Sequence, residues 1–153
     1  MKIRKATKND ILDVLKLVKQ ITDYHCKIDK LYKPYKEYRR LKEHLEETIE
    51  NRDRIIIVAE DNNKIIGYFK GGIEDAPNYI TPKKIGVIDD AFIKKEYRNK
   101  GIGDKLLNQM LKYFRTKKIK YIGLSVDARN VIGVNFWKEN DFFEHRIEMR
   151  RIL

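Results

Sequence analysis

A glycine-containing loop is the segment of this chain whose residue types and spacing best suit chemistry. It reads Arg98-Asn99-Lys100-Gly101-Ile102-Gly103 and stands between an apolar, strand-like stretch and a helical pattern. Glycines let backbone N–H groups approach an anion closely, and the N-terminus of a helix adds partial positive charge at the same place. Arg98 and Lys100 add two full positive charges. The loop therefore predicts a binding site for a pyrophosphate.

The spacing of the glycines excludes two other phosphate-binding motifs. A Walker loop has its second glycine five residues after the first, followed by Lys and then Ser or Thr. Here Gly101 is followed by Gly103 and then by Asp104 and Lys105. A dinucleotide-binding fingerprint would need a third glycine at position 106, which is Leu106. Because two glycines before a helix are often a plain tight turn, the residues around the loop decide its meaning.

Two adjacent acids, Asp89 and Asp90, precede the loop in the strand-like stretch 85–93. A carboxylate at such a place can take a proton from a nucleophile, directly or through a water molecule. Alternation along a strand predicts that the two side chains point to opposite faces of the sheet. Each could equally be a solvated acid or an ion-pair partner for one of the many Lys and Arg side chains. The sequence does not separate these alternatives.

Hydrophobic periodicity predicts the elements that hold these residues. Thr7 followed by Asp10 resembles a capping box that opens the first helix. The order β-α-α-β-β-β-α-β-α-β predicts one mixed sheet covered by helices, with an irregular stretch at 24–35 and a loop at 74–83. The strands are predicted at 2–6, 54–59, 65–73, 85–93, 121–126 and, as an extended tail, 142–153; the helices are predicted at about 7–23, 38–49, 106–114 and 130–137.

The stretch from Ala91 to Gly103 closely resembles the central motif of the GNAT superfamily of N-acetyltransferases, in which an apolar strand leads into Arg-x-x-Gly-x-Gly. Residues 130–142 are similar to a second segment of that family, Asn-x-x-Ala…Leu-Tyr-Glu-Lys-x-Gly-Phe. The resemblance implies a single N-acetyltransferase domain over residues 1–153, of α/β (α+β) class. Its mixed, mostly antiparallel sheet would be flanked by about four helices. The co-substrate would be acetyl-CoA, and the acceptor an amine of a small molecule, peptide or protein.

The resemblance also implies which residues hold the donor. The backbone of three strand residues would pair with the pantetheine arm as an added strand. The amides from Asn99 through Asp104 would hold the pyrophosphate, and Asn130 would contact the arm or its adenosine end. The expected cofactor-binding set is Ala91, Phe92, Ile93, Arg98, Asn99, Lys100, Gly101, Ile102, Gly103, Asp104 and Asn130.

For the chemistry, the acidic pair looks like the Glu-Asp of diamine acetyltransferases. Asp89 is our first expectation for the base or water-orienting group, and Asp90 the second. Trp137 stands where many relatives have a tyrosine that protonates the departing thiolate. An indole N–H cannot act as such an acid, so the thiolate would leave unassisted or take its proton from water or another tyrosine. Trp137 is then expected to be a packing residue. Gly133 and Asp141 are milder departures from the motif.

The acceptor is not named by the sequence. In the family, the region between the first two helices usually lines the acceptor pocket. That region holds Tyr24, His25, Asp29, Tyr32 and Tyr35.

Bulk composition narrows the remaining possibilities. The formal net charge is +11, but its basic residues are spread along the chain and mixed with acids, so a nucleic-acid partner is not expected. No apolar run is long enough to cross a bilayer, and a cytoplasmic location is expected. Cys26 is the single cysteine, and no metal site is expected. A homodimer through exposed sheet edges is possible, and the alternative function is a non-catalytic acyl-CoA-sensing module, motivated by Trp137.

Overall fold

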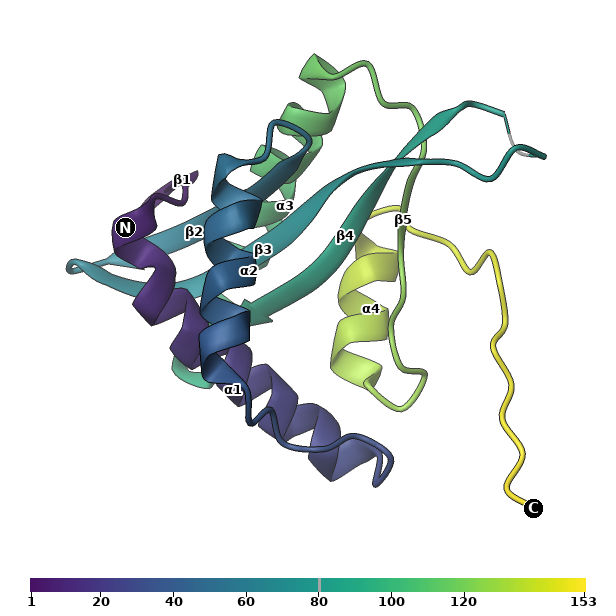
Figure 1. Ribbon diagram of the computed structural model, residues 1–153, viewed down its shortest axis with the longest axis horizontal. Coiled ribbons are helices and arrows are strands. Elements are labelled where there is room, and N and C mark those ends of the chain that lie inside the picture. Colours follow the sequence, from purple (N-terminus) through teal and green to yellow (C-terminus); the bar gives the residue numbers. More distant parts are fainter. Residues whose placement is uncertain (80) are drawn as a thin grey trace.

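A computed structural model describes residues 1–79 and 81–153, and within them five strands form one sheet in the order β1-β2-β3-β4-β5 (Figure 1). The first four strands pair antiparallel, and β5 pairs parallel with β4. The predicted mixed, mostly antiparallel sheet is thereby confirmed. The elements are β1 Lys2–Lys5, η1 Lys8–Asp10, α1 Ile11–Ile28, α2 Tyr38–Glu50, β2 Arg54–Asp61, β3 Lys64–Asp75, β4 Lys84–Ile93, η2 Lys95–Tyr97, α3 Ile102–Thr116, β5 Ile122–Leu124 and α4 Val131–Glu139.

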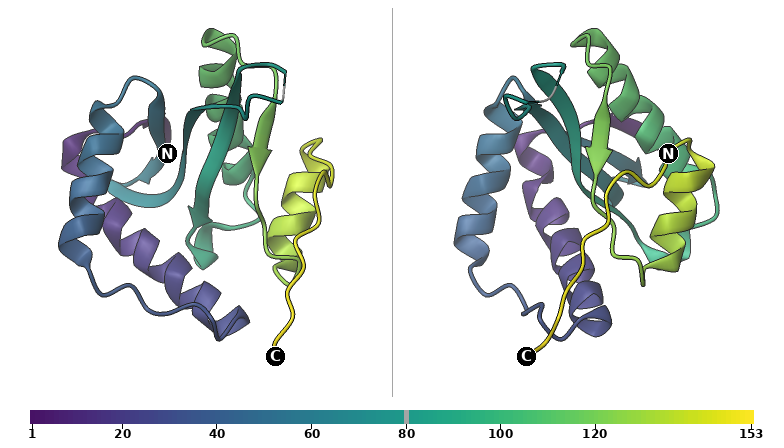
Figure 2. Two further views of the ribbon diagram at one scale, coloured as in Figure 1. Left: turned by 45° about the vertical axis from the view of Figure 1, so that its right-hand side comes forward. Right: turned by 90° about the vertical axis from the view of Figure 1, so that its right-hand side faces the viewer.

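Helices cover both faces of the sheet (Figure 2). On one face, α1 and α2 pack against Ile56 and Val58 of β2. On the other, α3 and α4 pack against Ile55 and Ile57 of the same strand. Because both faces are buried, β2 is apolar at every position from 55 to 59 and shows no polar alternation.

The start of the first helix is fixed by one buried acid. Asp10 is 7% exposed, and its carboxylate accepts hydrogen bonds from the Thr7 amide at 2.7 Å and from both terminal nitrogens of Arg4 at 2.7 and 2.8 Å. These contacts lower the pKa of Asp10 to about 2, with the Arg4 hydrogen bond as the largest cause. The predicted pairing of Thr7 with Asp10 is confirmed, and Arg4 of β1 ties the helix start to the sheet.

Several predicted bounds differ from the structure. The helix predicted to end near residue 23 continues to Ile28, because no helix breaker interrupts the chain before Asp29, whose amide donates to the His25 carbonyl at 2.9 Å. Residues 142–153, predicted as a final strand, form no strand.

The predicted loop 74–83 is shorter in the structure, since β3 runs to Asp75 and β4 begins at Lys84; residue 80 lies outside the described residues. No helix in the described ranges is both long and apolar enough to cross a membrane.

Candidate functional site

The central feature of the site is the place where β4 and β5 part. Their parallel pairing covers only Gly86 to Ile88 of β4, opposite Ile122 to Leu124. Beyond that point, β4 continues to Ile93 with β3 along one edge and, among the described residues, no strand along the other. Ala91, Phe92 and Ile93 lie in this part, partly buried. Their unpaired edge could accept an extended ligand as an added strand.

A β-bulge interrupts β4 just before this edge. Lys70 of β3 lies opposite Asp90 and Gly71 lies opposite Ile88, so Asp89 is the extra residue. A bulge breaks the alternation of side chains. Ile88 therefore packs on the α3 face, while Asp89 and Asp90 both contact residues of the α1 and α2 face. The prediction that the two aspartates point to opposite faces is wrong for this reason.

The two aspartates have different surroundings. Asp89 accepts a hydrogen bond from Arg54 at 3.0 Å, and Arg54 also bonds to Glu74 at 2.9 Å, in a half-exposed cluster. Asp90 instead accepts a hydrogen bond from the hydroxyl of Tyr68, a side chain of β3 with no exposed surface. Burial raises the pKa of the Asp90 carboxyl, against lowering by the Tyr68 hydrogen bond and by the charges of Lys70 and His25.

Tyr68 is a residue of this site that the sequence analysis did not single out. Burial, followed by the charge of Asp90, raises the pKa of its hydroxyl well above the ordinary value, so Tyr68 remains a donor. Two signals were available in the sequence. A tyrosine inside a buried strand needs a partner for its hydroxyl. A glycine within a strand, such as Gly71, often marks a bulge.

The glycine loop presents a row of free donors. From Asn99 to Asp104, six consecutive backbone amides donate to no protein acceptor in the part of the chain that the structure describes. The amides on either side are paired, since that of Arg98 donates to the Lys95 carbonyl at 3.2 Å and that of Lys105 donates to the Gly101 carbonyl at 3.3 Å. The α3 N-terminus lies at the same place. Such a row of amides at a helix start is suited to binding phosphate oxygens.

Glycine is needed at positions 101 and 103 for different structural reasons. Gly101 has a φ of 67°, a left-handed conformation that favours glycine at the start of α3. Position 103 has no room for a side chain, because the ring of Phe136 occupies the space and a Cβ there would lie 2.7 Å from that ring. Glycine at position 103 thus lets α4 pack closely on α3. Its contact with Phe136 brings the motif at 91–103 against the motif at 130–142.

The charged residues of the loop are held by neighbouring groups. The Nε of Arg98 donates to the Ile93 carbonyl at 2.9 Å, and its guanidinium lies over the Phe92 ring. The Lys100 ammonium lies over the Tyr97 ring, 5.4 Å from its centroid. Both positive groups therefore stay beside the free amides. An anion bound by those amides would meet their charge.

A family model described as Acetyltransferase (GNAT) family matches residues 25–142. The chain belongs to this family. It is 23% identical over 144 residues to an uncharacterized N-acetyltransferase, YhfO, of Bacillus subtilis (strain 168), with 94% of this chain and 91% of that protein covered. Together with the family match, the N-acetyltransferase name of this relative makes this chain an acyltransferase.

Solved structures show the same fold. A tetramutant of the BH1408 protein from Bacillus halodurans has a TM-score of 0.89 at 22% identity, with 100% of both chains covered. The aminoglycoside N-acetyltransferase AAC(6')-Iy, solved in complex with CoA, has a TM-score of 0.81 at 16% identity, with 99% of this chain and 93% of that chain covered.

In this GNAT-family chain, Asn130 caps α4 and also reaches α1. Its Oδ1 accepts from the Gly133 amide and from the Tyr24 hydroxyl, each at 3.1 Å. A Cβ on residue 133 would lie 2.6 Å from the Asn130 side chain, which explains why glycine stands where the family usually has alanine. The predicted cap is confirmed, and the remaining donor is the Asn130 Nδ2.

Trp137 is a packing residue. It is 8% exposed and lies among three other aromatic rings, with centroids 4.9 to 5.7 Å away. These rings belong to Phe69, Phe136 and Phe142. The packing interpretation of Trp137 is confirmed.

The region that the family uses for acceptors lies at the C-terminal end of α1. His25 stacks on Tyr32 at 5.3 Å and meets Tyr24 edge-on at 6.0 Å, and its Nδ1 is buried without a hydrogen-bond partner among the described residues. Asp29 accepts from Arg129 at 2.8 Å. These contacts bring the end of α1 to the segment that leads into α4.

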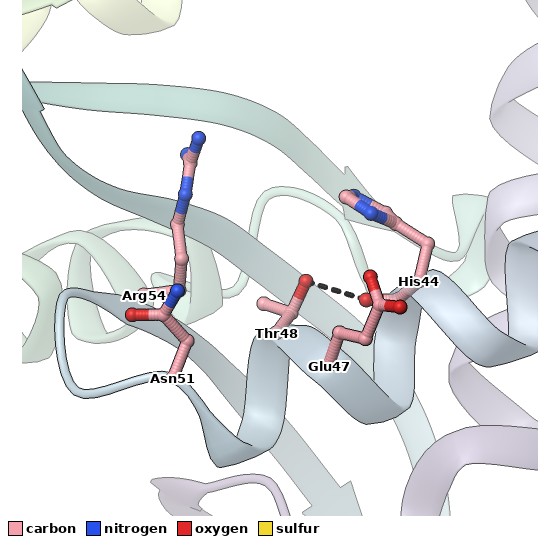
Figure 3. Close-up of a pocket in the computed structure, with 5 residues that line it drawn as sticks. All are labelled: His44, Glu47, Thr48, Asn51 and Arg54. Atoms are coloured by element: carbon pink, nitrogen blue, oxygen red, sulfur yellow. Dashed lines mark hydrogen bonds between the residues drawn. The ribbon is translucent and has the colours of Figure 1, made fainter.

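A shallow hollow lies on the α2 side, lined by His44, Glu47, Thr48, Asn51 and Arg54 (Figure 3). Thr48 donates to the His44 carbonyl at 2.8 Å within the helix. The Arg54 side chain points away from these helix residues in Figure 3. Its guanidinium donates to Asp89 and Glu74. We assign no ligand to this hollow, because Arg54 and Thr48 are already paired and His44, Glu47 and Asn51 are exposed.

Proposed function

We propose that this chain transfers the acetyl group of acetyl-CoA to a primary amine by direct transfer in a ternary complex. The observation that carries the proposal is the row of unpaired amides from Asn99 to Asp104, which continues from the unpaired edge of β4. The amides suit the pyrophosphate of CoA, and the strand edge suits its pantetheine arm. This arrangement would place the thioester near the bulge, beside Asp90.

Asp90 is the group to which we assign proton removal. The amine nitrogen attacks the thioester carbonyl carbon, the carbon–sulfur bond breaks, and the proton lost by the amine passes to Asp90 directly or through water. A carboxylate whose pKa is raised by burial is a stronger base than an exposed one. The carboxylate of Asp89, which was our first expectation for the base, is neutralised by Arg54. We therefore assign Asp89 a supporting role beside Asp90 and not the removal of the proton.

The oxyanion and the leaving group need partners as well. A backbone N–H on the open edge of β4 would donate to the thioester oxygen. Because Trp137 is buried and cannot supply a proton, the thiolate would leave unassisted or take its proton from water.

The acceptor class follows from charge. Asp90 lies on the α1 and α2 face and bonds to the Tyr68 hydroxyl and, among the described residues, to no arginine or lysine, so a positively charged amine would be attracted to it. The related fold of AAC(6')-Iy, solved with a bisubstrate analogue named CoA-S-monomethyl-acetylneamine, adds aminoglycosides to the amines to be screened.

The test is an assay of free thiol release from acetyl-CoA over polyamines, amino acids, aminoglycosides and peptide N-termini, with CoA binding measured in parallel. We expect Gly101→Glu to abolish CoA binding and Asp90→Asn to abolish turnover while binding persists. Asp89→Asn is the matched control and should retain most of the activity. CoA binding unchanged in Gly101→Glu would refute the loop assignment. Binding without turnover of any amine would favour the acyl-CoA-sensing alternative.

A further inference from the structure

A lysine interrupts the buried part of β3. The residues on either side of Lys70, 65–69 and 71–72, are buried, and Lys70 itself is half-buried. In the sheet it lies opposite Ile56 of β2 and opposite Asp90 of β4. A charged group in a buried stretch is costly unless an opposite charge or a hydrogen bond compensates it. The position of this ammonium group therefore calls for a partner.

Lys70 lies on the same face of the sheet as the proposed base. Residues directly opposite each other on neighbouring strands share a face, and their Cβ atoms lie about 4.5–5.5 Å apart. Ile56, the other neighbour of Lys70, packs with α1 and α2 on the face that these helices cover in Figure 2. The side chains of Lys70 and Asp90 therefore both project toward α1 and α2. An amine that reaches Asp90 from this side would also meet Lys70.

The acidic side chains beside this position on β3 and β4 have other partners. Arg54 donates to Asp89 at 3.0 Å and to Glu74 at 2.9 Å. Asp90 accepts from a tyrosine hydroxyl of β3. Among the described residues, the Lys70 ammonium forms no hydrogen bond or ion pair. It is therefore available to an anionic group of a ligand.

A second unpaired polar group lies near Asp90. The Nδ1 of His25 is buried and, within the described part of the chain, has no hydrogen-bond partner. Its ring stacks on Tyr32 and meets Tyr24 edge-on, so aromatic contacts fix its position. Burial raises the pKa of Asp90, and the charges of Lys70 and His25 both oppose that rise, so both groups lie close to the same carboxyl. Because most buried side-chain nitrogens are hydrogen-bonded, the His25 Nδ1 suits a polar atom of a ligand.

We propose that the acceptor is a small amino acid, whose amine lies at Asp90 and whose carboxylate is bound by Lys70 and His25. Since the reacting amine is taken to lie beside Asp90, this assignment rests on the proposed acetyl transfer. The ammonium of Lys70 attracts the carboxylate, and the Nδ1–H of His25 donates to it. The amine nitrogen bonds to the acetyl carbon as the carbon–sulfur bond breaks. The net products are an N-acetylamino acid, the thiol of CoA and one proton.

Charge discriminates between the classes of acceptor. A zwitterion whose two charges are close together presents each of them to an opposite charge, at Asp90 and at Lys70. A diamine brings a second positive charge against Lys70, which disfavours its binding. A plain alkylamine leaves Lys70 without a partner. Amino acids should therefore be preferred over diamines and alkylamines of the same length.

Acceptors matched in chain length test the proposal. Thiol release from acetyl-CoA is measured with three pairs, glycine and ethylamine, β-alanine and propylamine, and γ-aminobutyrate and butylamine, with putrescine as the diamine. We expect kcat/KM to be roughly tenfold or more higher for the amino acid in at least one pair, chiefly through a lower KM. Putrescine should give the lowest value. The pair with the largest ratio shows which distance between amine and carboxylate the site accepts.

Charge variants show whether Lys70 sets this preference. Lys70→Met keeps the length of the side chain and removes its charge, so the preference should fall by roughly tenfold while CoA binding persists. Lys70→Glu should reverse the preference in favour of putrescine and the alkylamines. Because the same acceptors are compared in every variant, differences in amine basicity cancel. Lys64→Glu is the matched control, since it makes the same change at an exposed position of β3, opposite Asp61, and should keep the preference.

Variants of His25 test the second contact. His25→Phe keeps a ring against Tyr32 and Tyr24 but removes the nitrogen, so KM for the preferred amino acid should rise several-fold while kcat is retained. His25→Asn places an amide near the Nδ1 position and should restore part of the lost affinity. His44→Phe, at an exposed position of α2, is the control and should leave both constants unchanged.

The outcomes separate the amino-acid acceptor from the acetyl transfer on which it rests. Equal or preferred turnover of alkylamines or putrescine by the unaltered chain would overturn the amino-acid acceptor and leave acetyl transfer standing. An equal loss of activity toward every acceptor in Lys70→Met would do the same, because it would mean that Lys70 acts only on Asp90. Turnover of no amine at all would overturn both.

Discussion

The hydroxyl of Tyr68 donates to the carboxylate of Asp90 from the neighbouring strand, where β5 has already separated from β4. Tyr68 lies opposite Phe92 in the register, so it meets Asp90 on the diagonal. The bulge at Asp89 makes this contact possible, because it turns Asp90 to the same face as Tyr68. Through this contact, the geometry of the sheet affects the pKa of Asp90, the proposed base.

Removing that hydroxyl should change the pH profile. The hydrogen bond stabilises the charged form of Asp90, so Tyr68→Phe should raise the pKa of Asp90 further. The acid limb of kcat/KM for thiol release should then move to higher pH. Loss of the hydrogen bond should also destabilise the fold by about 1–2 kcal/mol.

Tyr113→Phe is the matched control, because among the described residues the Tyr113 hydroxyl donates only to the Arg52 carbonyl, at 3.3 Å on the surface. Its pH profile should equal that of the unaltered chain. An acid limb that stays in place in Tyr68→Phe would mean that Asp90 is not the group seen in the profile.

The close packing of α4 on α3 predicts a specific coupling. Gly103→Ala would place a Cβ 2.7 Å from the Phe136 ring and should cost about 1–3 kcal/mol of stability by overpacking. In a Phe136→Leu background the same change should cost much less, since the ring edge is gone. Thermal unfolding of the two single variants and the double variant measures this coupling. Additive effects would show that residue 103 is not limited by Phe136.

The fold was largely predictable because its signals are local. The apolar run at 55–59, the spacing of Leu106, Met110 and Phe114, and the glycine loop each depend on nearby residues, and each appears in the structure as predicted. The free amides at 99–104 agree with the predicted pyrophosphate loop, although ligand binding itself stays a prediction.

The parts that could not be predicted depend on contacts between distant segments. The faces of Asp89 and Asp90 are set by a bulge that arises from the pairing of β4 with β3. The need for glycine at 103 comes from Phe136, thirty-three positions away in the sequence. The tail has a strand pattern without a strand in the structure, because pairing needs a partner that periodicity does not identify.

Acid should destabilise the chain through Asp10. Its pKa is lowered to about 2 by Arg4 and Thr7. The contribution of the Asp10 charge to the free energy of unfolding is therefore complete above the ordinary pKa near 4, and it is lost as the pH falls toward 2. A depression of this size corresponds to about 2 kcal/mol at neutral pH. In urea unfolding, Asp10→Asn should lose about that amount at pH 7 and approach the unaltered chain near pH 2. Asp13→Asn, in an exposed pair with Lys16, should change little. An equal loss at both pH values would contradict the assignment to charge.

Three segments of the chain meet at Asp29. Its side chain is 6% exposed and accepts from Arg129, from Arg150 and from the Leu31 amide, and these contacts lower its pKa well below the usual range for an aspartate. Asp29→Asn keeps an acceptor for the Leu31 amide but removes the charge that both arginines need. Hydrogen exchange should therefore become several-fold faster in the tail around Arg150 and in the loop before α4.

The amide of Leu31 should change least, and this contrast separates loss of charge from general unfolding. Asp127→Asn is a suitable control, because Asp127 pairs with Arg129 at 2.7 Å and, among the described residues, forms no hydrogen bond or ion pair with α1 or the tail. It should loosen the loop before α4 and leave the tail unchanged. If Asp29→Asn left the exchange around Arg150 as it was, the ion pair between Asp29 and Arg150 would not be what holds the tail to the body.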